Sequence, residues 1–148
     1  MKEKKNKHEN IAELICDLTR KCGIKEDYFA SSFELTPSEV RLLKLFVSKS
    51  FRTVKEIKEY LRLTPGRITH ILCSLESKGI LKRENDKKDK RNVNVHLLPN
   101  SEPFISEMNK NYKALNDEIF KRVSKSKIDN IYKSLTILLE AFDSWIKK

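Results

Sequence analysis

The stretch LTPGRITHILCSLESKGIL, residues 63–81, decides the fold of this chain. It begins with Thr64 and Pro65, the residue types preferred at a helix N-cap and at the first helical position. Apolar residues follow at helical spacing, and Gly79 is a typical helix stop. The apolar stripe consists of Ile68, Ile71, Leu72 and Leu75. We therefore expect a helix that starts at Pro65, buries one face and ends near Gly79.

Two more helix starts precede this stretch, and both are capping boxes. The sequences TPSE at residues 36–39 and TVKE at residues 53–56 each place Thr at the N-cap and Glu three residues later. The expected inward faces are Val40, Leu43, Phe46 and Val47 in the first helix, and Ile57, Tyr60 and Leu61 in the second. Two helices are thus expected before Thr64, the second of them short.

After Gly79 the apolar period changes from 3.6 to 2, which is typical of strands. One strand is expected at residues 80–83, and a second where Val93, Val95 and Leu97 alternate with polar residues. Residues 84–92 between them form a charged tip. The order of helix, short turn, helix and hairpin predicts a winged helix-turn-helix.

Both ends of the chain are also predicted to be helical. The first eight or nine residues are a charge run expected to fray, and Gly23 is expected to end or bend the first helix near Lys21. The apolar residues of that helix are Ile11, Leu14, Ile15 and Leu18. Tyr28, Phe29 and Phe33 follow as an apolar cluster, of core residues or of residues lining a ligand pocket.

Two helices are expected after the hairpin. The stripe of the first is Phe104, Met108, Tyr112, Leu115, Ile119 and Val123. The sequence SKID at residues 126–129 is a weak cap for the second helix, whose stripe is spaced as in a heptad repeat. That stripe consists of Ile128, Ile131, Leu135, Leu138, Phe142 and Trp145. By itself such a stripe is usually intrachain core.

Composition and charge restrict the class of protein. The 148 residues contain 31 Lys and Arg against 21 Asp and Glu, and the excess is concentrated in the middle of the chain. Residues 36–98 hold 15 basic and 7 acidic side chains, a net charge of +8, against zero before them and +2 after them. Clustered positive charge favours a polyanionic partner. A solvated Lys-rich surface is the alternative.

Several classes are excluded at this stage. No stretch approaches the roughly 20 apolar residues that span a bilayer, and there is no signal-peptide core. The three cysteines do not form a disulfide framework, so we expect a cytoplasmic protein. We find no phosphate loop, nucleophile elbow or metal-ligand cluster, and therefore expect no enzyme and no cofactor.

The helix that begins at Pro65 is suited to reading DNA. Its face opposite the apolar stripe is small or polar, without an acidic residue before Glu76. We expect base readout by Arg67, Thr69 and His70, close backbone approach at Thr64, Pro65 and Gly66, and a phosphate held at Thr53. The charged hairpin tip would supply phosphate attraction through Lys87, Lys88 and Lys90.

These residues resemble the MarR family of winged-helix transcriptional regulators, with the match running from Leu35 to Leu98. Asp89-Lys90-Arg91 before a Val-x-Val strand is similar to the family's wing. The resemblance implies that Arg91 enters the minor groove, that Asp89 orients it or a nearby basic residue, and that residues 65–70 read the major groove. Two departures are Leu98-Pro-Asn-Ser-Glu-Pro after the wing, and His70 where many relatives have Arg.

The resemblance also implies a homodimer whose chain ends interleave. Residues 1–35 and 99–148 would form the dimerisation helices, and residues 36–98 the DNA-binding lobe of a mainly α chain with a small β-hairpin wing. The dimer residues would be Ile11, Leu14, Ile15, Ile128, Ile131, Leu135, Leu138, Phe142 and Trp145.

The expected activity is that of a repressor on a palindromic operator, released by an unidentified small molecule. Cys16 is an alternative redox sensor of the family type, although Glu13 and Asp17 beside it oppose a reactive thiolate. Cys73 is a second redox candidate, with a half-buried filler thiol as its preferred interpretation. A different class of function would be a winged helix used for protein interaction or DNA architecture without sequence preference.

Overall fold

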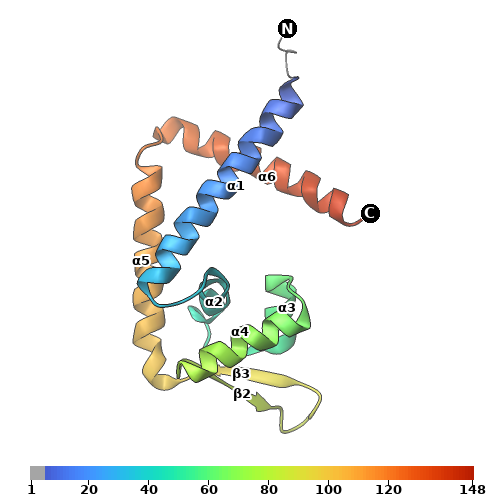
Figure 1. The fold of residues 1–148 in the computed structure, drawn as a ribbon, viewed down its shortest axis with the longest axis vertical. Coiled ribbons are helices and arrows are strands. Elements are labelled where there is room, and N and C mark those ends of the chain that lie inside the picture. The colour runs from blue at the N-terminus through green and yellow to red at the C-terminus, as the bar shows by residue number, and fades with distance from the viewer. Residues whose placement is uncertain (1–5) are drawn as a thin grey trace. The chain divides into compact units, whose positions relative to one another are not determined.

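The computed structural model describes residues 6–148, and the chain forms two compact units that divide after Asn109. The first unit contains α1 (Lys7–Ser32), α2 (Pro37–Leu43), the 3₁₀ turn η1 (Lys44–Phe46), β1 (Phe51–Thr53), α3 (Val54–Leu61), α4 (Pro65–Ser77), β2 (Leu81–Asn85), β3 (Val93–Leu97) and the 3₁₀ turn η2 (Pro99–Ser101) (Figure 1). Helix α5 (Glu102–Phe120) runs from the first unit into the second, which also contains α6 (Lys125–Ile146).

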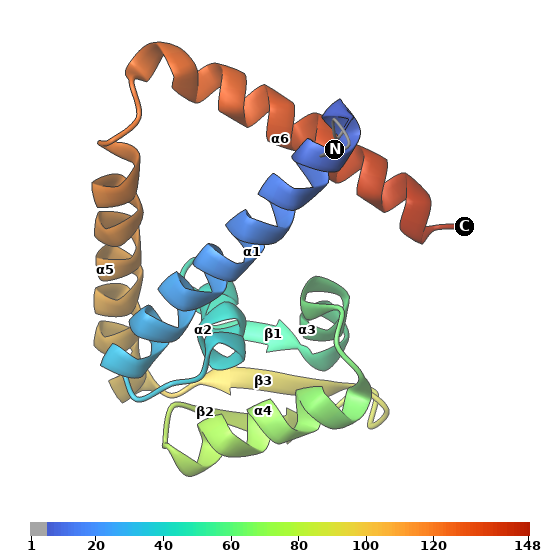
Figure 2. The ribbon, with the colours of Figure 1, turned by 45° about the horizontal axis from the view of Figure 1, so that its top comes forward.

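The first unit is a winged helix-turn-helix. Its three strands form an antiparallel sheet in the order β1-β3-β2, and Figure 2 shows this sheet with α2, α3 and α4 around it. In the hairpin Leu81 pairs with Leu97 and Asn85 with Val93. The mainly helical fold with a β-hairpin wing is thus confirmed. The short strand β1 was not predicted, because three residues carry too little periodicity to be recognised before their partner strand is known.

The core of this unit is formed by the apolar faces of its helices and strands. The stripe on α4 is buried as predicted, and Leu81 and Val95 of the hairpin are buried as well. The side chains with almost no exposure are Val40, Leu42, Leu43, Ile57, Ile68, Leu72, Leu75, Leu81, Val95 and Met108. Full burial of each aliphatic side chain contributes about 1.5–3 kcal/mol to folding. Only the apolar stripe of α4 takes part in this core, and the opposite face of the helix is exposed.

The predicted helix starts are confirmed in detail. Thr36 and Glu39 form a capping box at α2, in which the side chain of each residue accepts the main-chain N–H of the other, and Thr53 and Glu56 do the same at α3. Thr64 caps α4, whose first residue is Pro65. Beyond Ser77 the chain turns at Gly79 with φ of +71°, a conformation that glycine adopts without steric cost.

Helix α1 is longer than predicted at both ends. It begins at Lys7 behind an Asn6–Glu9 capping box, and it continues through Gly23 to Ser32. The prediction of fraying is therefore wrong for residues 6–9, and the rest of that charge run lies outside the described residues. A glycine inside a helix costs only about 1 kcal/mol relative to alanine, which is too little to end this 26-residue helix.

Four apolar side chains lie differently from the prediction. Val47 is 43% exposed and Tyr60 is 50% exposed. In the apolar cluster Tyr28 is 72% exposed, Phe29 is buried, and Phe33 is partly covered by Phe104. Ile119 on α5 is also exposed. These residues lie at the margins of apolar stripes, where helical spacing alone does not tell which side of the stripe is covered.

Two further boundaries differ. Residue Ile80 precedes β2 rather than belonging to it. The last helix begins at Lys125, and its N-cap position is Ser124, whose side chain makes no capping bond, not Ser126.

The second unit leaves α6 uncovered. No residue of α6 is buried by the described chain, so its heptad stripe is not intrachain core. Leu135, Phe142 and Trp145 on this stripe are 40%, 46% and 67% exposed. The described helices include none that is long and apolar enough to cross a membrane.

Candidate nucleic-acid interface

The N-terminal half of α4 presents an exposed surface. Gly66, Arg67, Thr69 and His70 are all exposed, while Ile68 between them faces the core. The Thr69 hydroxyl donates to the carbonyl of Pro65 at 3.0 Å, so its proton is used within the helix. The Thr64 hydroxyl accepts the main-chain N–H of Arg67 at 3.4 Å. The guanidinium and imidazole groups of this half-helix are thus the donors that can reach a ligand.

The wing loop is shaped by its own acidic residues. The Asp86 carboxylate accepts the main-chain N–H groups of Lys88 at 2.7 Å and Asp89 at 3.3 Å, and Asp89 accepts that of Arg91 at 3.0 Å. These bonds, from the Lys88 amide first, hold the pKa of Asp86 below its ordinary value. Lys87, Lys88, Lys90 and Arg91 remain exposed at the loop surface. The carboxylates of Asp86 and Asp89 therefore accept hydrogen bonds from the loop backbone, and the basic side chains are exposed to solvent.

The loop geometry bears on two of the predicted residues. The carboxylate of Asp89 contacts Arg91 at its backbone N–H, and the predicted orienting of the Arg91 side chain stays a prediction. Asp86 was not among the predicted site residues. Its bond to the main-chain N–H two residues later is an Asx turn, and an Asp in a turn is the sequence signal for one.

An ion pair joins α4 to the wing. Glu76 accepts the side chain of Arg83 through Nε at 2.7 Å and Nη2 at 3.1 Å, and it also accepts the main-chain N–H of Arg83 at 2.9 Å. The pairing, chiefly the side-chain bond, lowers the pKa of Glu76 and raises that of Arg83. The wing strand β2 is thereby fixed to the last turn of the helix that carries Arg67 and His70.

The remaining titratable and thiol groups are more scattered. Cys16, Cys22 and Cys73 are all free and exposed, so the interpretation of Cys73 as a half-buried thiol is wrong. Its sulfur accepts a hydrogen bond from Arg83 Nη2 at 3.0 Å. Cys73 is exposed because the buried face of α4 is the apolar stripe that begins at Ile68, and Cys73 is not part of that stripe. Among residues 6–148 no three His, Cys, Asp or Glu side chains lie together as a metal site.

Thr53 is the N-cap of α3, and the carboxylate of Glu56 already lies at this helix start. Glu56 accepts the main-chain N–H of Thr53 at 2.7 Å, and the Thr53 hydroxyl accepts the N–H of Glu56 at 3.1 Å. The hydrogen bond from the Thr53 main chain is the largest cause that lowers the pKa of Glu56, whose carboxylate is negative at neutral pH. A phosphate at Thr53 would therefore share the helix start with this negative charge.

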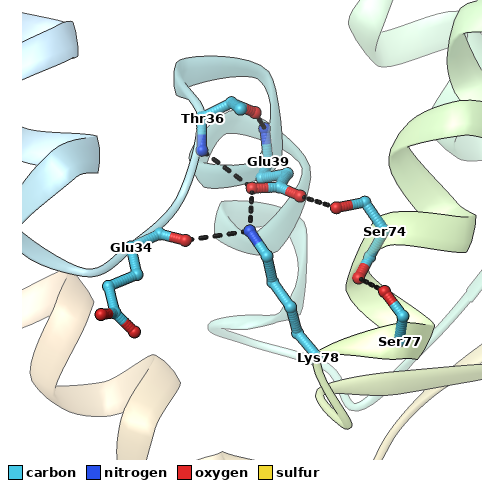
Figure 3. Close-up of polar contacts among 6 residues, drawn as sticks. All are labelled: Glu34, Thr36, Glu39, Ser74, Ser77 and Lys78. Atoms are coloured by element: carbon cyan, nitrogen blue, oxygen red, sulfur yellow. Dashed lines mark hydrogen bonds and ion pairs between the residues drawn. The ribbon is translucent and has the colours of Figure 1, made fainter.

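Glu39 lies behind the interface and is 2% exposed, the most deeply buried acidic residue described. Figure 3 shows its carboxylate between Thr36, Ser74 and Lys78. It accepts the N–H of Thr36 at 2.8 Å, the hydroxyl of Ser74 at 2.6 Å and the ammonium of Lys78 at 2.8 Å. Burial raises the pKa of Glu39, and the bonds from Lys78, Ser74 and Thr36 more than offset it, so the pKa lies below its ordinary value. The sequence indicated the cap but not the two contacts to α4.

Comparison with known proteins places this geometry in a family. Residues 35–93 match the model of the MarR family. YkoM, an uncharacterised helix-turn-helix transcriptional regulator of Bacillus subtilis, is 32% identical over 72 residues, which are 49% of this chain and 47% of YkoM. The chain thus spans about half the length of this curated relative in the match.

Solved structures agree in fold. The MepR–DNA complex of S. aureus is 18% identical with a TM-score of 0.77, and the match covers 88% of this chain and 96% of MepR. Streptococcus pneumoniae FabT in complex with DNA is 23% identical with a TM-score of 0.76, over 93% of this chain and 99% of FabT. The winged-helix geometry, the matched residues 35–93 and these neighbours agree with one another. Residues 35–93 of this chain therefore match the MarR family of winged-helix transcriptional regulators.

Proposed function

We propose that this chain binds double-stranded DNA in a sequence-specific manner and regulates transcription as a repressor. The observation that carries the proposal is the pairing of an exposed, acid-free half-helix with a wing loop whose two aspartates, Asp86 and Asp89, accept hydrogen bonds from the loop's own backbone. Such a surface offers donors and positive charge to DNA without desolvating a carboxylate. The DNA complexes of MepR and FabT, which have the same fold, support the proposal.

The proposed roles follow from position on this surface. Arg67 and His70 read base edges in the major groove, with Thr69 contacting through its oxygen and methyl group. Thr64, Pro65 and Gly66 let the backbone approach. Arg91 enters the minor groove beside a wing that Asp89 shapes, and Lys87, Lys88 and Lys90 attract phosphate. Thr53 is the weakest member of the set, because Glu56 is already bound at its helix start.

We also propose that the chain acts as a homodimer on a palindromic operator. Residues 1–35 and 99–148 are the dimerisation segments, and residues 36–98 the DNA-binding lobe. The support is the apolar surface that α1 and α6 leave uncovered in one chain, including Leu14 at 67% exposure. The proposed interface residues are Ile11, Leu14, Ile15, Ile128, Ile131, Leu135, Leu138, Phe142 and Trp145. Covering such faces with a second copy removes apolar area from water.

Release from DNA by a small molecule completes the proposal, although no described residue identifies that molecule. A redox signal is the second candidate, and one observation favours Cys73 over Cys16 for it. The exposed Cys73 sulfur is bonded to Arg83, which also pairs with Glu76. Oxidation of this thiol would disturb the link between α4 and the wing.

The proposal is tested by selecting bound duplexes from a random DNA pool at low and at moderate salt. An enriched two-fold symmetric site, with half-sites about one helical turn apart, is the expected result. Enrichment without a motif that vanishes as salt rises would mean binding by charge alone. In that case the architectural or protein-interaction function would replace the one proposed.

A further inference from the structure

Three segments of the first unit meet at the carboxylate of Glu39 (Figure 3). Thr36 lies in the connection after α1, Glu39 is on α2, and Ser74 and Lys78 lie at the end of α4. Ser74 is 35 positions after Glu39 in the chain, and Lys78 is 39 positions after it. Their bonds to Glu39 are therefore tertiary contacts, added to a local capping box.

The two contacts on α4 restrict how that helix can move. Ser74 and Lys78 are four residues apart, so they lie on the same face one turn apart. Ser74 bonds one carboxylate oxygen of Glu39 and Lys78 the other. Apolar packing of the α4 stripe has no direction and tolerates small rotations, whereas two bonds to one carboxylate fix both the rotation and the axial position of the helix.

Lys78 extends the connection to α1. Its ammonium also donates to the carbonyl of Glu34 at 2.9 Å. Glu34 follows α1 with φ of 56°, a left-handed conformation that is uncommon outside glycine and costs about 1–2 kcal/mol. The carbonyl of this strained residue and the carboxylate of Glu39 thus bind one ammonium, and a displacement at the end of α1 is felt at the end of α4.

The reading residues lie at the other end of α4. Arg67 is seven residues before Ser74, which is about 10 Å along the helix axis. A tilt of about 10° about Ser74 would displace Arg67 by about 2 Å, which is enough to break a hydrogen bond to a base. The anchored end and the reading end of α4 are therefore mechanically related.

We propose that Glu39 is a positioning residue for DNA readout, holding the recognition helix α4 in register with α2 and with the end of α1. The proposal rests on the function proposed above. Glu39 does not touch DNA in this scheme. It acts through Ser74 and Lys78, so its loss should lower the affinity for the operator without lowering non-specific binding to phosphates.

The test compares Glu39→Gln and Ser74→Ala with a matched control, Glu9→Gln. A glutamine at position 39 removes the negative charge that pairs with Lys78, and its amide NH₂ can meet Ser74 only if the hydroxyl turns to accept. Ser74→Ala removes one bond and leaves the cap. Glu9→Gln alters the capping box of α1, which has the same local geometry but no contact with α4.

Affinity is measured by fluorescence anisotropy on the selected operator duplex and on a scrambled duplex, with each variant shown to be folded by circular dichroism. We expect Glu39→Gln to bind the operator about tenfold more weakly, which is about 1.4 kcal/mol. Ser74→Ala should lose roughly threefold, since one of three bonds is removed. Binding to the scrambled duplex, and both affinities of Glu9→Gln, should stay within about twofold of wild type.

The outcomes separate the two levels of the proposal. If wild type prefers no sequence, the proposed function fails and the role of Glu39 fails with it. If wild type is specific and the Glu39 and Ser74 variants keep that specificity, the positioning role alone is overturned. A parallel loss on both duplexes would also overturn it, because that indicates general destabilisation. Should Glu39→Gln not fold, Ser74→Ala decides the question.

Discussion

The pair of Glu76 and Arg83 connects the recognition helix to the wing, and a double-mutant cycle measures its strength. Arg83→Ala removes only the side-chain bonds, whereas Glu76→Ala also removes the bond to the main-chain N–H of Arg83. Glu76→Ala should therefore be the more destabilising change. In the double variant the pair is absent, and its effect should be close to that of Glu76→Ala alone.

The magnitude follows from exposure and geometry. Hydrogen bonds to charged groups contribute about 1.5–3 kcal/mol, and exposed ion pairs about 0.2–1 kcal/mol. The two side chains are 29% and 31% exposed, which places the pair between these limits. We expect the free energy of unfolding to fall by about 1 kcal/mol in Arg83→Ala and about 2 kcal/mol in Glu76→Ala, with a coupling energy of about 1 kcal/mol.

The assay is urea unfolding followed by circular dichroism, at neutral and at acid pH. The pKa of Glu76 is lowered from its ordinary value of 4.5, so the pair stabilises the folded state above that pH and its contribution is lost as the pH falls through the lowered pKa. Glu84→Ala is the control, because this carboxylate lies on the same strand and is 52% exposed, 3.6 Å from His96. A coupling energy below about 0.3 kcal/mol at neutral pH, or one that persists at about pH 2, would refute the reasoning.

Three further predictions concern binding, assembly and acid stability. Arg91→Ala should weaken operator binding by about 1–3 kcal/mol in an anisotropy titration, and an unchanged affinity would remove Arg91 from base readout. Glutamate at both Leu138 and Phe142 should give the mass of one chain, or an unfolded chain, by light scattering with circular dichroism, whereas a folded dimer would contradict the proposed interface. In Glu39→Gln the free energy of unfolding, measured by urea titration, should fall less steeply below about pH 4.5 than in wild type. The reason is that the lowered pKa of Glu39 makes its carboxylate stabilising above that pH, and this stabilisation is lost as the pH falls through the lowered pKa. An equally steep fall in both proteins would exclude this carboxylate as the cause.

Features encoded over three or four residues were predicted well. The capping boxes at Thr36 and Thr53, the cap at Thr64 and the stop at Gly79 depend on contacts within one turn, so the spacing of residue types is sufficient to identify them. The α4 stripe was equally legible, because four apolar residues on a helix of thirteen leave a single burial face.

Features that depend on distant residues were not predicted. The burial of Glu39 results from Ser74 and Lys78, which are 35 and 39 positions away, and a Glu at a capping-box position gives no sign of such partners. The pairing of Glu76 with Arg83 depends on how β2 leaves α4. Gly23 was assigned too much weight, since one glycine costs a helix only about 1 kcal/mol, and α1 continues through it to Ser32.

The candidate interface lies between these cases. Its basic residues were recognisable from composition, but the hydrogen bonds that bind Asp86 and Asp89 to the wing backbone appear only in the folded loop. They change the meaning of the charge count, because two of the acidic side chains near the tip are turned toward main-chain amides.

The exposure of α6 has a spectroscopic consequence. Trp145 is the only tryptophan in the chain, and its indole is 67% exposed on that helix. All intrinsic tryptophan emission therefore originates from one position, remote in sequence from the residues proposed to contact DNA. An indole in water emits at longer wavelength than one enclosed by apolar groups. Dilution of the unlabelled protein should thus shift its emission to the red if a second copy covers α6, and the concentration at the midpoint of that shift would give the dissociation constant of the assembly.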